Sequence, residues 1–266
     1  MSDMRLAATV ILARSPLEVY LTRRSARSTS APDAFVFPGG TIERQDATQA
    51  VQARTLGLTP ERVAGEFRAT IPPALESNEP QVGERDARAL LVAALRELFE
   101  EAGVLLARDA TGAPVPADAV LSDNAFEQRV ALREGTLAFA DFLAQRDWFA
   151  DARELTLFSH WITPPSEPRR YNTHFFFAAA PANQAARADA HETHDGVWIA
   201  PAEALRRYRA GEMHLVYPTI KHLERLSALR SVEEAAKIAR SKPVLTIMPN
   251  PQAEAFAIPP ELEDAW

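Results

Sequence analysis

The chain contains no cysteine among its 266 residues. This absence excludes disulfide bonds, thiol nucleophiles, cysteine-ligated zinc and iron–sulfur clusters. Positive charge is not in excess either, because 29 basic residues face 36 acidic ones and the formal net charge is −7. A protein that binds duplex DNA needs a basic face, so we expect no nucleic-acid polymer as a partner. Local arginines or a metal ion would have to hold a phosphate-bearing ligand.

Long apolar runs are also missing. The run near the start, Leu6–Ala13, is much shorter than the roughly 20 apolar residues of a membrane span. It lacks the flanks of a secretory signal and predicts a buried strand, with no membrane partner. The last residues, Asp264, Ala265 and Trp266, form no peroxisomal address. We therefore expect a cytoplasmic protein.

The apolar pattern predicts a single α/β domain, since 47% hydrophobic and 24% charged residues are typical of a globular chain. Strands are expected at Leu6–Ala13, Leu17–Arg23, Phe35–Phe37, Leu157–Ile162, His174–Ala179 and Gly196–Ile199. Pro38, Gly39 and Gly40 are expected to stop the third of these strands. Helices are expected as one or two short segments between Asp46 and Pro80, then at Arg85–Leu106 with Gly103 as the stop, Asp123–Arg133, Leu137–Arg146, Pro201–Ala210 and Tyr217–Leu229. The tail from Pro243 is expected to be extended.

The predicted helix 85–106 carries the most informative pattern. At about 100° per residue, Glu101 falls about 40° and Glu100 about 60° from Glu97, on opposite sides, so the three carboxylates share one stripe. Like charges this close destabilise a helix by about 0.2–0.5 kcal/mol per pair, and the C-terminal end is the unfavourable one for acids. A solvated acidic face is the alternative. A divalent cation would resolve the repulsion, because Mg²⁺ binds carboxylate oxygens and keeps waters for substrate phosphates.

The sequence Arg96-Glu97-Leu98-Phe99-Glu100-Glu101-Ala102-Gly103-Val104 resembles the second half of the Nudix box, G-x5-E-x7-R-E-U-x-E-E-x-G-U. Its first half is visible in Gly40 and, six positions later, Asp46. Asp46 replaces the usual glutamate, and about 42 extra residues precede Arg96. A box with an insertion resembles the peroxisomal-type coenzyme A diphosphatase subfamily and its bacterial relatives.

This resemblance implies a Nudix-type α/β/α sandwich with a mixed central sheet and helical insertions. The Nudix domain would span residues 1–232, with insertions at 47–84 and 109–155, and residues 233–266 would form a C-terminal extension.

The resemblance also implies roles for individual residues. Glu97, Glu100 and Glu101 would bind Mg²⁺ or Mn²⁺, with a Gly39 or Gly40 carbonyl as a further ligand. Either Glu97 or Glu101 would activate the attacking water. Arg96 would fix a glutamate by a charge-assisted hydrogen bond, and Asp46 would be a supporting partner. The implied reaction is hydrolysis of a small-molecule diphosphate.

Coenzyme A-cleaving Nudix proteins carry an upstream signature similar to L-L-T-x-R-[SA]-x3-R-x3-G-x3-F-P-G-G. Matching residues are Leu21, Thr22, Arg24, Ser25 and the segment 37–40, whereas Tyr20, Thr29 and Asp33 depart from the signature. Coenzyme A or acyl-CoA is therefore the preferred substrate, giving 3′,5′-ADP and (acyl-)4′-phosphopantetheine. ADP-ribose, NADH or a nucleoside triphosphate is the alternative, and a non-catalytic ligand-sensing module is a third hypothesis.

Other charged groups have two interpretations each. Arg23, Arg24 and Arg27 form either a substrate site or a surface cluster, and Arg169 with Arg170 could clamp phosphates or be exposed. His191 and His194 are spaced i,i+3, which does not fit the i,i+4 metalloprotease motif. Their segment predicts a loop, in which Glu192 or Asp195 could assist a metal. A homodimer is possible. The sequence lacks G-x-S-x-G, G-x-G-x-x-G and G-x4-G-K-[ST], which removes the common serine-hydrolase, dinucleotide and P-loop functions.

Overall fold

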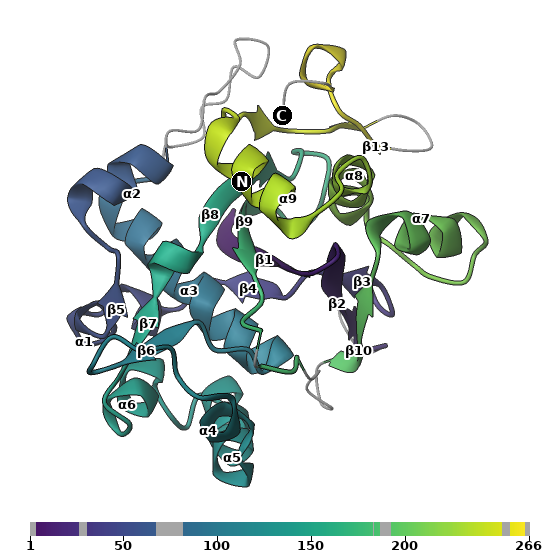
Figure 1. Cartoon of the computed structure of the whole chain (residues 1–266). Helices are drawn as coiled ribbons and strands as arrows, with labels where there is room; N and C mark the ends of the chain where they lie inside the picture. Colours follow the sequence, from purple (N-terminus) through teal and green to yellow (C-terminus); the bar gives the residue numbers. More distant parts are fainter. Residues whose placement is uncertain are drawn as a thin grey trace.

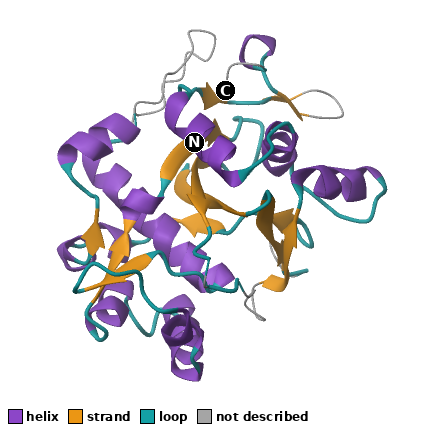
Figure 2. Cartoon of the chain, in the orientation of Figure 1, coloured by secondary structure: helices purple, strands orange, loops and turns teal. Residues whose placement is uncertain are grey.

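An eight-stranded mixed sheet forms the centre of the molecule (Figures 1 and 2). The computed structural model describes residues 4–26, 31–67, 82–182, 184–186, 193–251 and 256–263. The sheet order is β10-β2-β1-β9-β8-β11, with β3 paired to β2 and β4 to β1. The β1–β9 and β8–β11 pairs are parallel and the other pairs are antiparallel. The strands are β1 (Arg5–Arg14), β2 (Glu18–Arg24), β3 (Phe35–Val36), β4 (Gly39–Thr41), β8 (Thr156–Ile162), β9 (Tyr171–Ala179), β10 (Thr193–Ile199) and β11 (Thr246–Ile247).

Alternate residues of the central strands face two separate hydrophobic cores. In β1, Val10 and Leu12 belong to one core, whereas Ile11 and Ala13 belong to the other, as the two-residue period of a strand requires. Helix α3 (Glu84–Ala102) covers the first face, and α7 (Pro201–Arg209), α8 (Tyr217–Ser227) and α9 (Val232–Ser241) cover the second. The expected α/β/α sandwich with a mixed sheet is confirmed.

Helix α3 is the long helix of the first layer and is buried along most of its length. Glu84 and Asp86 lie in its first turn, where acids stabilise the helix dipole. It ends at Ala102, because Gly103 adopts a left-handed conformation at φ 66° and donates its N–H to the Phe99 carbonyl at 2.9 Å. The predicted stop at Gly103 is right, whereas the predicted continuation to Leu106 is wrong.

The expected strand stop is confirmed, because β3 ends at Val36, before Pro38. Gly39 and Gly40 then begin a further strand that was not expected, β4, and pair with Thr9 and Ala8 of β1. A Cβ added to Gly39 would lie 2.4 Å from the Ala8 carbonyl oxygen. The glycines therefore permit a close backbone approach that larger residues would prevent.

Two segments lie beside the sandwich and meet in a small three-stranded sheet, β5-β7-β6. The first segment comprises η1 (Arg44–Ala47), α1 (Gln49–Ala53), β5 (Thr55–Leu56) and α2 (Pro60–Glu66). The second comprises β6 (Ala107–Asp109), α4 (Ala117–Leu121), α5 (Asp123–Arg133), α6 (Phe139–Ala144), β7 (Trp148–Asp151) and η3 (Ala152–Glu154). The two helices expected in the second segment are present as α5 and α6, and β7 joins the two segments.

The C-terminal part contributes to the sandwich. Helix α9 follows α8 in a stretch for which the sequence pattern predicted no element. Its buried residues Val232, Ala235 and Ala239 pack into the second core. Beyond it, β11 joins the sheet edge, followed by β12 (Asn250–Pro251), β13 (Phe256–Ala257) and η4 (Pro260–Leu262).

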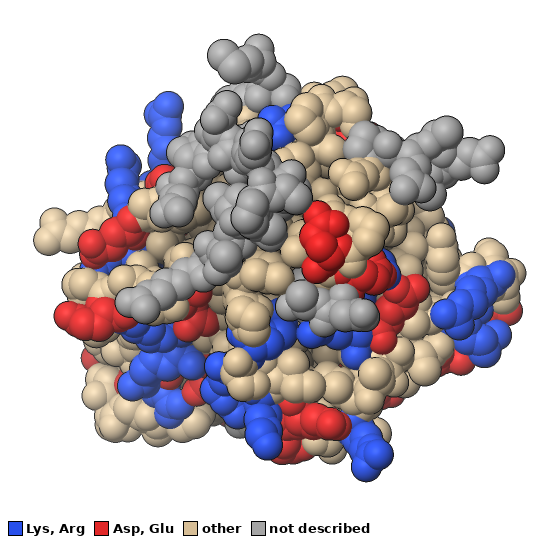
Figure 3. Space-filling view, turned by 90° about the horizontal axis from the view of Figure 1, so that it is seen from above, with Lys and Arg blue, Asp and Glu red and all other residues tan. Residues whose placement is uncertain are grey.

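On the described surface that Figure 3 displays, acidic and basic side chains lie next to one another. Among the described helices, none has the combination of length and apolar character that a membrane crossing requires.

We predict that Phe142→Ala lowers the free energy of unfolding by about 3–5 kcal/mol, the usual cost of deleting a buried phenylalanine side chain. Phe142 of α6 is fully buried and stacks on Phe99 of α3 at 4.9 Å between ring centroids. Denaturant unfolding measures the change. Phe126→Ala on α5 is the control, because Phe126 is 52% exposed, and its effect should stay below about 0.5 kcal/mol. Equal effects of the two substitutions would contradict the docking of α6 on α3.

Candidate active site

Arg96 is the centre of a buried ionic network between α3 and η1, which begins the first of the two segments beside the sandwich. Both Arg96 and Asp46 are fully buried. The Arg96 guanidinium donates Nε to Asp46 Oδ1 at 2.9 Å and Nη2 to Asp46 Oδ2 at 3.0 Å. Asp46 Oδ2 also accepts the Glu43 backbone N–H at 2.8 Å. Asp46, at the position of the first glutamate of the Nudix box, is thus part of a bidentate ion pair.

The same guanidinium also contacts two of the three helix carboxylates. Nη1 of Arg96 lies 3.0 Å from Glu97 Oε1 and donates to Glu100 Oε2 at 3.2 Å. Nη2 also donates to the Thr41 carbonyl at 3.3 Å. The repulsion that the sequence suggested a metal would resolve is therefore offset in part by Arg96.

Burial nevertheless opposes ionisation of the two carboxylates. Loss of solvation raises the pKa of Glu97 to about 7 and that of Glu100 to about 7, although the Arg96 charge acts in the opposite direction. Mutual repulsion between the two acids raises the pKa of Glu100 further. Burial raises the pKa of Asp46 as well, against the same guanidinium. The cluster therefore contains more carboxylate than one arginine neutralises.

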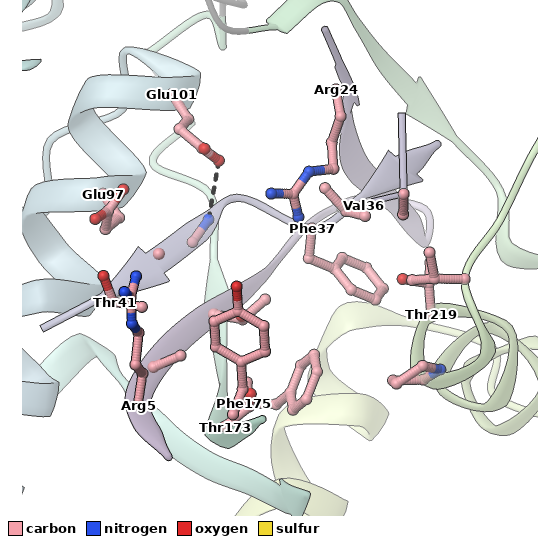
Figure 4. Close-up of a pocket in the computed structure, with 18 of the residues that line it drawn as sticks. Arg5, Arg24, Val36, Phe37, Thr41, Glu97, Glu101, Thr173, Phe175 and Thr219 are labelled. Atoms are coloured by element: carbon pink, nitrogen blue, oxygen red, sulfur yellow. Dashed lines mark hydrogen bonds between the residues drawn. The ribbon is translucent and has the colours of Figure 1, made fainter. Parts of the chain in front are cut away.

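Gly39 and Gly40 of β4 lie directly against these acids. Glu101 Oε2 accepts the Gly39 backbone N–H at 2.9 Å, drawn as the dashed line in Figure 4. A Cβ on Gly40 would lie 2.4 Å from Glu97 Oε1. The absence of a side chain at Gly40 is what lets the backbone approach Glu97.

A cavity of about 530 Å³ opens beside Gly39 and Gly40. Glu97, Glu100 and Glu101 line it together with Gly39 and Gly40.

Three arginines also line this cavity: Arg5 of β1, Arg24 of β2 and Arg133 of α5. In Figure 4, Arg5 and Arg24 both extend toward the side where Glu97 and Glu101 lie. Sequence reasoning identified Arg24 but missed Arg5 and Arg133. Arg5 had one signal, its position at the start of a predicted strand. Arg133 had no such signal, because it lies at the end of α5, in the second segment beside the sandwich.

The remaining predicted site residues are dispersed. Arg169 lines an adjoining cavity, and Arg170 donates Nε to the Thr163 carbonyl at 3.0 Å. Ser25 and Arg170 lie outside the described lining of the first cavity. Asp195 is exposed, with an oxygen 3.7 Å from Arg23. Glu192, Arg27 and Thr29 lie outside the described residues.

Behind Glu101 lies a second buried arginine that the sequence did not indicate. Arg129 of α5 is buried and donates Nε to the Glu100 carbonyl at 2.7 Å. Among the residues that the structure describes, its Nη2 atom and the buried Tyr20 hydroxyl have no hydrogen-bond partner. Burial lowers the pKa of Arg129 to about 10, against the attraction of Tyr20 and Glu101. The second segment beside the sandwich thus places a cation at the C-terminal end of the glutamate helix, which favours positive charge.

An α/β/α sandwich whose long helix presents these glutamates to the Gly39–Gly40 backbone defines a Nudix-type hydrolase. The sequence profile described as the NUDT19 Nudix domain matches residues 4–226. The chain therefore belongs to the NUDT19 Nudix domain family.

Similar proteins agree with this assignment. The chain is 29% identical to the acyl-coenzyme A diphosphatase NUDT19 of Gallus gallus, over 90% of this chain and 72% of that protein. It is 28% identical to the NUDT19 of Homo sapiens over 82% of this chain, but spans only 62% of the human protein. A solved NUDIX hydrolase from Alicyclobacillus acidocaldarius is 28% identical, with a TM-score of 0.69 and coverage of 92% of this chain and 98% of that one.

Nudix enzymes typically depend on divalent metal ions, so we tested whether the cluster fits one. Within the described residues, no group of three or more acidic or histidine side chains is already arranged to hold a metal ion. The donor type does fit, since Glu97, Glu100 and Glu101 supply hard oxygen atoms beside a substrate-sized cavity. Arg96 offsets only part of their charge. These residues thus fit a divalent cation by chemistry and location.

We predict that Asp46→Asn lowers the free energy of unfolding by about 3–5 kcal/mol, because it leaves the Arg96 charge short of a buried partner. Chemical denaturation of the metal-free protein measures the loss. Glu43→Gln is the matched control: its carboxylate lies 3.8 Å from Arg96 but its side chain is 52% exposed, so the cost should be at most about 1 kcal/mol. A neutral effect of Asp46→Asn would show that Arg96 does not depend on this pair.

Proposed function

We propose that this chain hydrolyses the diphosphate of coenzyme A or acyl-CoA in the presence of Mg²⁺ or Mn²⁺. Water adds to one phosphorus atom while the bridging P–O bond breaks, which yields 3′,5′-ADP and (acyl-)4′-phosphopantetheine. The supporting observation is that Arg24, from the coenzyme A-type signature, lines the same cavity as Glu97 and Glu101. The names of the chicken and human relatives support the same substrate class.

One departure from that signature keeps the backbone conformation that a glycine would allow. Asp33 stands at the glycine position and has φ 58°, a left-handed conformation that aspartate adopts more readily than most residues. Its carboxylate lies 3.2 Å from Arg23. The turn that leads into β3 is therefore compatible with coenzyme A as substrate.

Each group in the cavity has a distinct part in the proposed reaction. Arg5, Arg24 and Arg133 offset the phosphate charges and orient the diphosphate. Glu97, Glu100 and Glu101 would hold a divalent ion, with a Gly39 or Gly40 carbonyl as a further ligand. That ion would supply charge neutralisation at the leaving phosphate and lower the pKa of a water.

Glu97 or Glu101 accepts the proton of the attacking water. Glu101 is oriented by the Gly39 N–H. Arg96 and Asp46 hold the helix and do not touch substrate in this scheme.

We predict that Glu97→Gln and Glu101→Gln each lower kcat with coenzyme A at least about 100-fold, since each removes a carboxylate needed for the metal or the water. Chromatographic detection of 4′-phosphopantetheine measures the rate. Glu61→Gln on the exposed start of α2 is the control and should retain wild-type activity. Wild-type rates in both active-site variants would exclude the proposed roles.

ADP-ribose, NADH and nucleoside triphosphates are the alternative substrates. Comparing kcat/KM across these compounds, coenzyme A and acyl-CoA decides between them. The proposal expects the highest value for coenzyme A or an acyl derivative. A higher value for any other diphosphate would overturn the substrate assignment while leaving diphosphate hydrolysis in place.

A further inference from the structure

A second cavity, of about 370 Å³, adjoins the first. Thr163, Tyr171, Phe175 and Val216 line both cavities. The two spaces therefore form one cleft across β9, with the glutamates at one end. A ligand whose diphosphate lies at the glutamates can extend into the second cavity.

The wall of the second cavity is aromatic and comes partly from the tail. Trp161 of β8 and Tyr217 of α8 pack with their ring centroids 6.2 Å apart, and Phe256 of β13 lies 5.9 Å from Tyr217. The Tyr217 hydroxyl accepts the Ile258 N–H at 2.9 Å, and Ile258 is buried in the second core. Phe256 is thus held in place beside the cleft. It lies outside the residues 4–226 that match the family profile.

The first cavity is rich in charged side chains and the second has few. This matches coenzyme A, whose nucleotide half carries the phosphates and whose pantetheine half is uncharged. The first cavity contains Arg5, Arg24 and Arg133, which suit the phosphates. Arg169 and Glu167 are the charged residues in the described lining of the second cavity, and their formal charges cancel. An uncharged arm that ends in an apolar acyl chain suits such a site, since ligand cavities are mostly apolar with few polar groups.

We infer that the second cavity binds the acyl end of the pantetheine arm and that Phe256 sets the preferred acyl length. This inference rests on the proposed function. A side chain that bounds a hydrophobic cavity changes the space available for methylene groups, and each methylene contributes roughly 10-fold or more to discrimination. The tail would therefore act in substrate selection.

The test is a chain-length profile. We would measure kcat/KM for coenzyme A and for acetyl-, hexanoyl-, octanoyl- and lauroyl-CoA with the full chain. Phe256→Trp reduces the space and should lower the octanoyl-to-acetyl ratio of kcat/KM about 10-fold. Phe256→Ala enlarges the space and should move the preference toward longer chains. Opposite shifts from the two variants would not arise from a purely structural role.

Phe126→Trp, at an exposed position on α5, is the control and should keep the wild-type profile. Unchanged profiles in both folded Phe256 variants would overturn the inference while coenzyme A hydrolysis stands. A changed inhibition constant for 3′,5′-ADP with an unchanged acyl profile would also overturn it, by placing the nucleotide in this cavity. If the wild type hydrolyses neither coenzyme A nor any acyl-CoA, the proposed function fails and the inference falls with it.

Discussion

The buried guanidinium of Arg96 is the interaction on which the rest of the site depends. It ties α3 to Asp46 and the Thr41 carbonyl, and it also faces Glu97 and Glu100. A buried arginine without these acids would be costly, and the acids without the arginine would repel one another. The result is a cluster in which α3 and β4 are joined by hydrogen bonds, from Arg96 to the Thr41 carbonyl and from the Gly39 N–H to Glu101. The cluster still has carboxylate in excess of cation.

The two segments beside the sandwich and the C-terminal tail make direct contributions to the site. Arg129 and Arg133 come from α5, and Arg129 binds the Glu100 carbonyl at the end of the glutamate helix. Phe256 comes from the tail and lies beside the adjoining cavity. The Nudix helix supplies the acids, while more distant parts of the chain supply cations and apolar walls. Such a division is compatible with one chemistry acting on different diphosphates.

Much of this architecture could be predicted from sequence because its signals are local. The apolar runs placed β1 and β9, and the left-handed preference of Gly103 placed the end of α3. The glutamate stripe followed from the helical period alone. The position of Asp46 against Arg96 was not local: these residues are 50 positions apart, and only the folded chain shows their bidentate contact. Arg5, Arg129 and Arg133 were missed for the same reason, since a single arginine in a strand or helix carries no sign of what it faces. Pro38, Gly39 and Gly40 predicted the stop of β3 but not the pairing of the two glycines with β1 as a further strand.

Titration calorimetry of the metal-free chain with Mn²⁺ or Mg²⁺ tests the central claim most directly. The claim is that Arg96 leaves the Glu97, Glu100 and Glu101 cluster short of positive charge. It predicts saturable binding by the wild type and at least about 10-fold weaker binding by Glu97→Gln, because the substitution removes one charged oxygen ligand. Absence of metal binding by the wild type, or equal affinity in the two proteins, would contradict it.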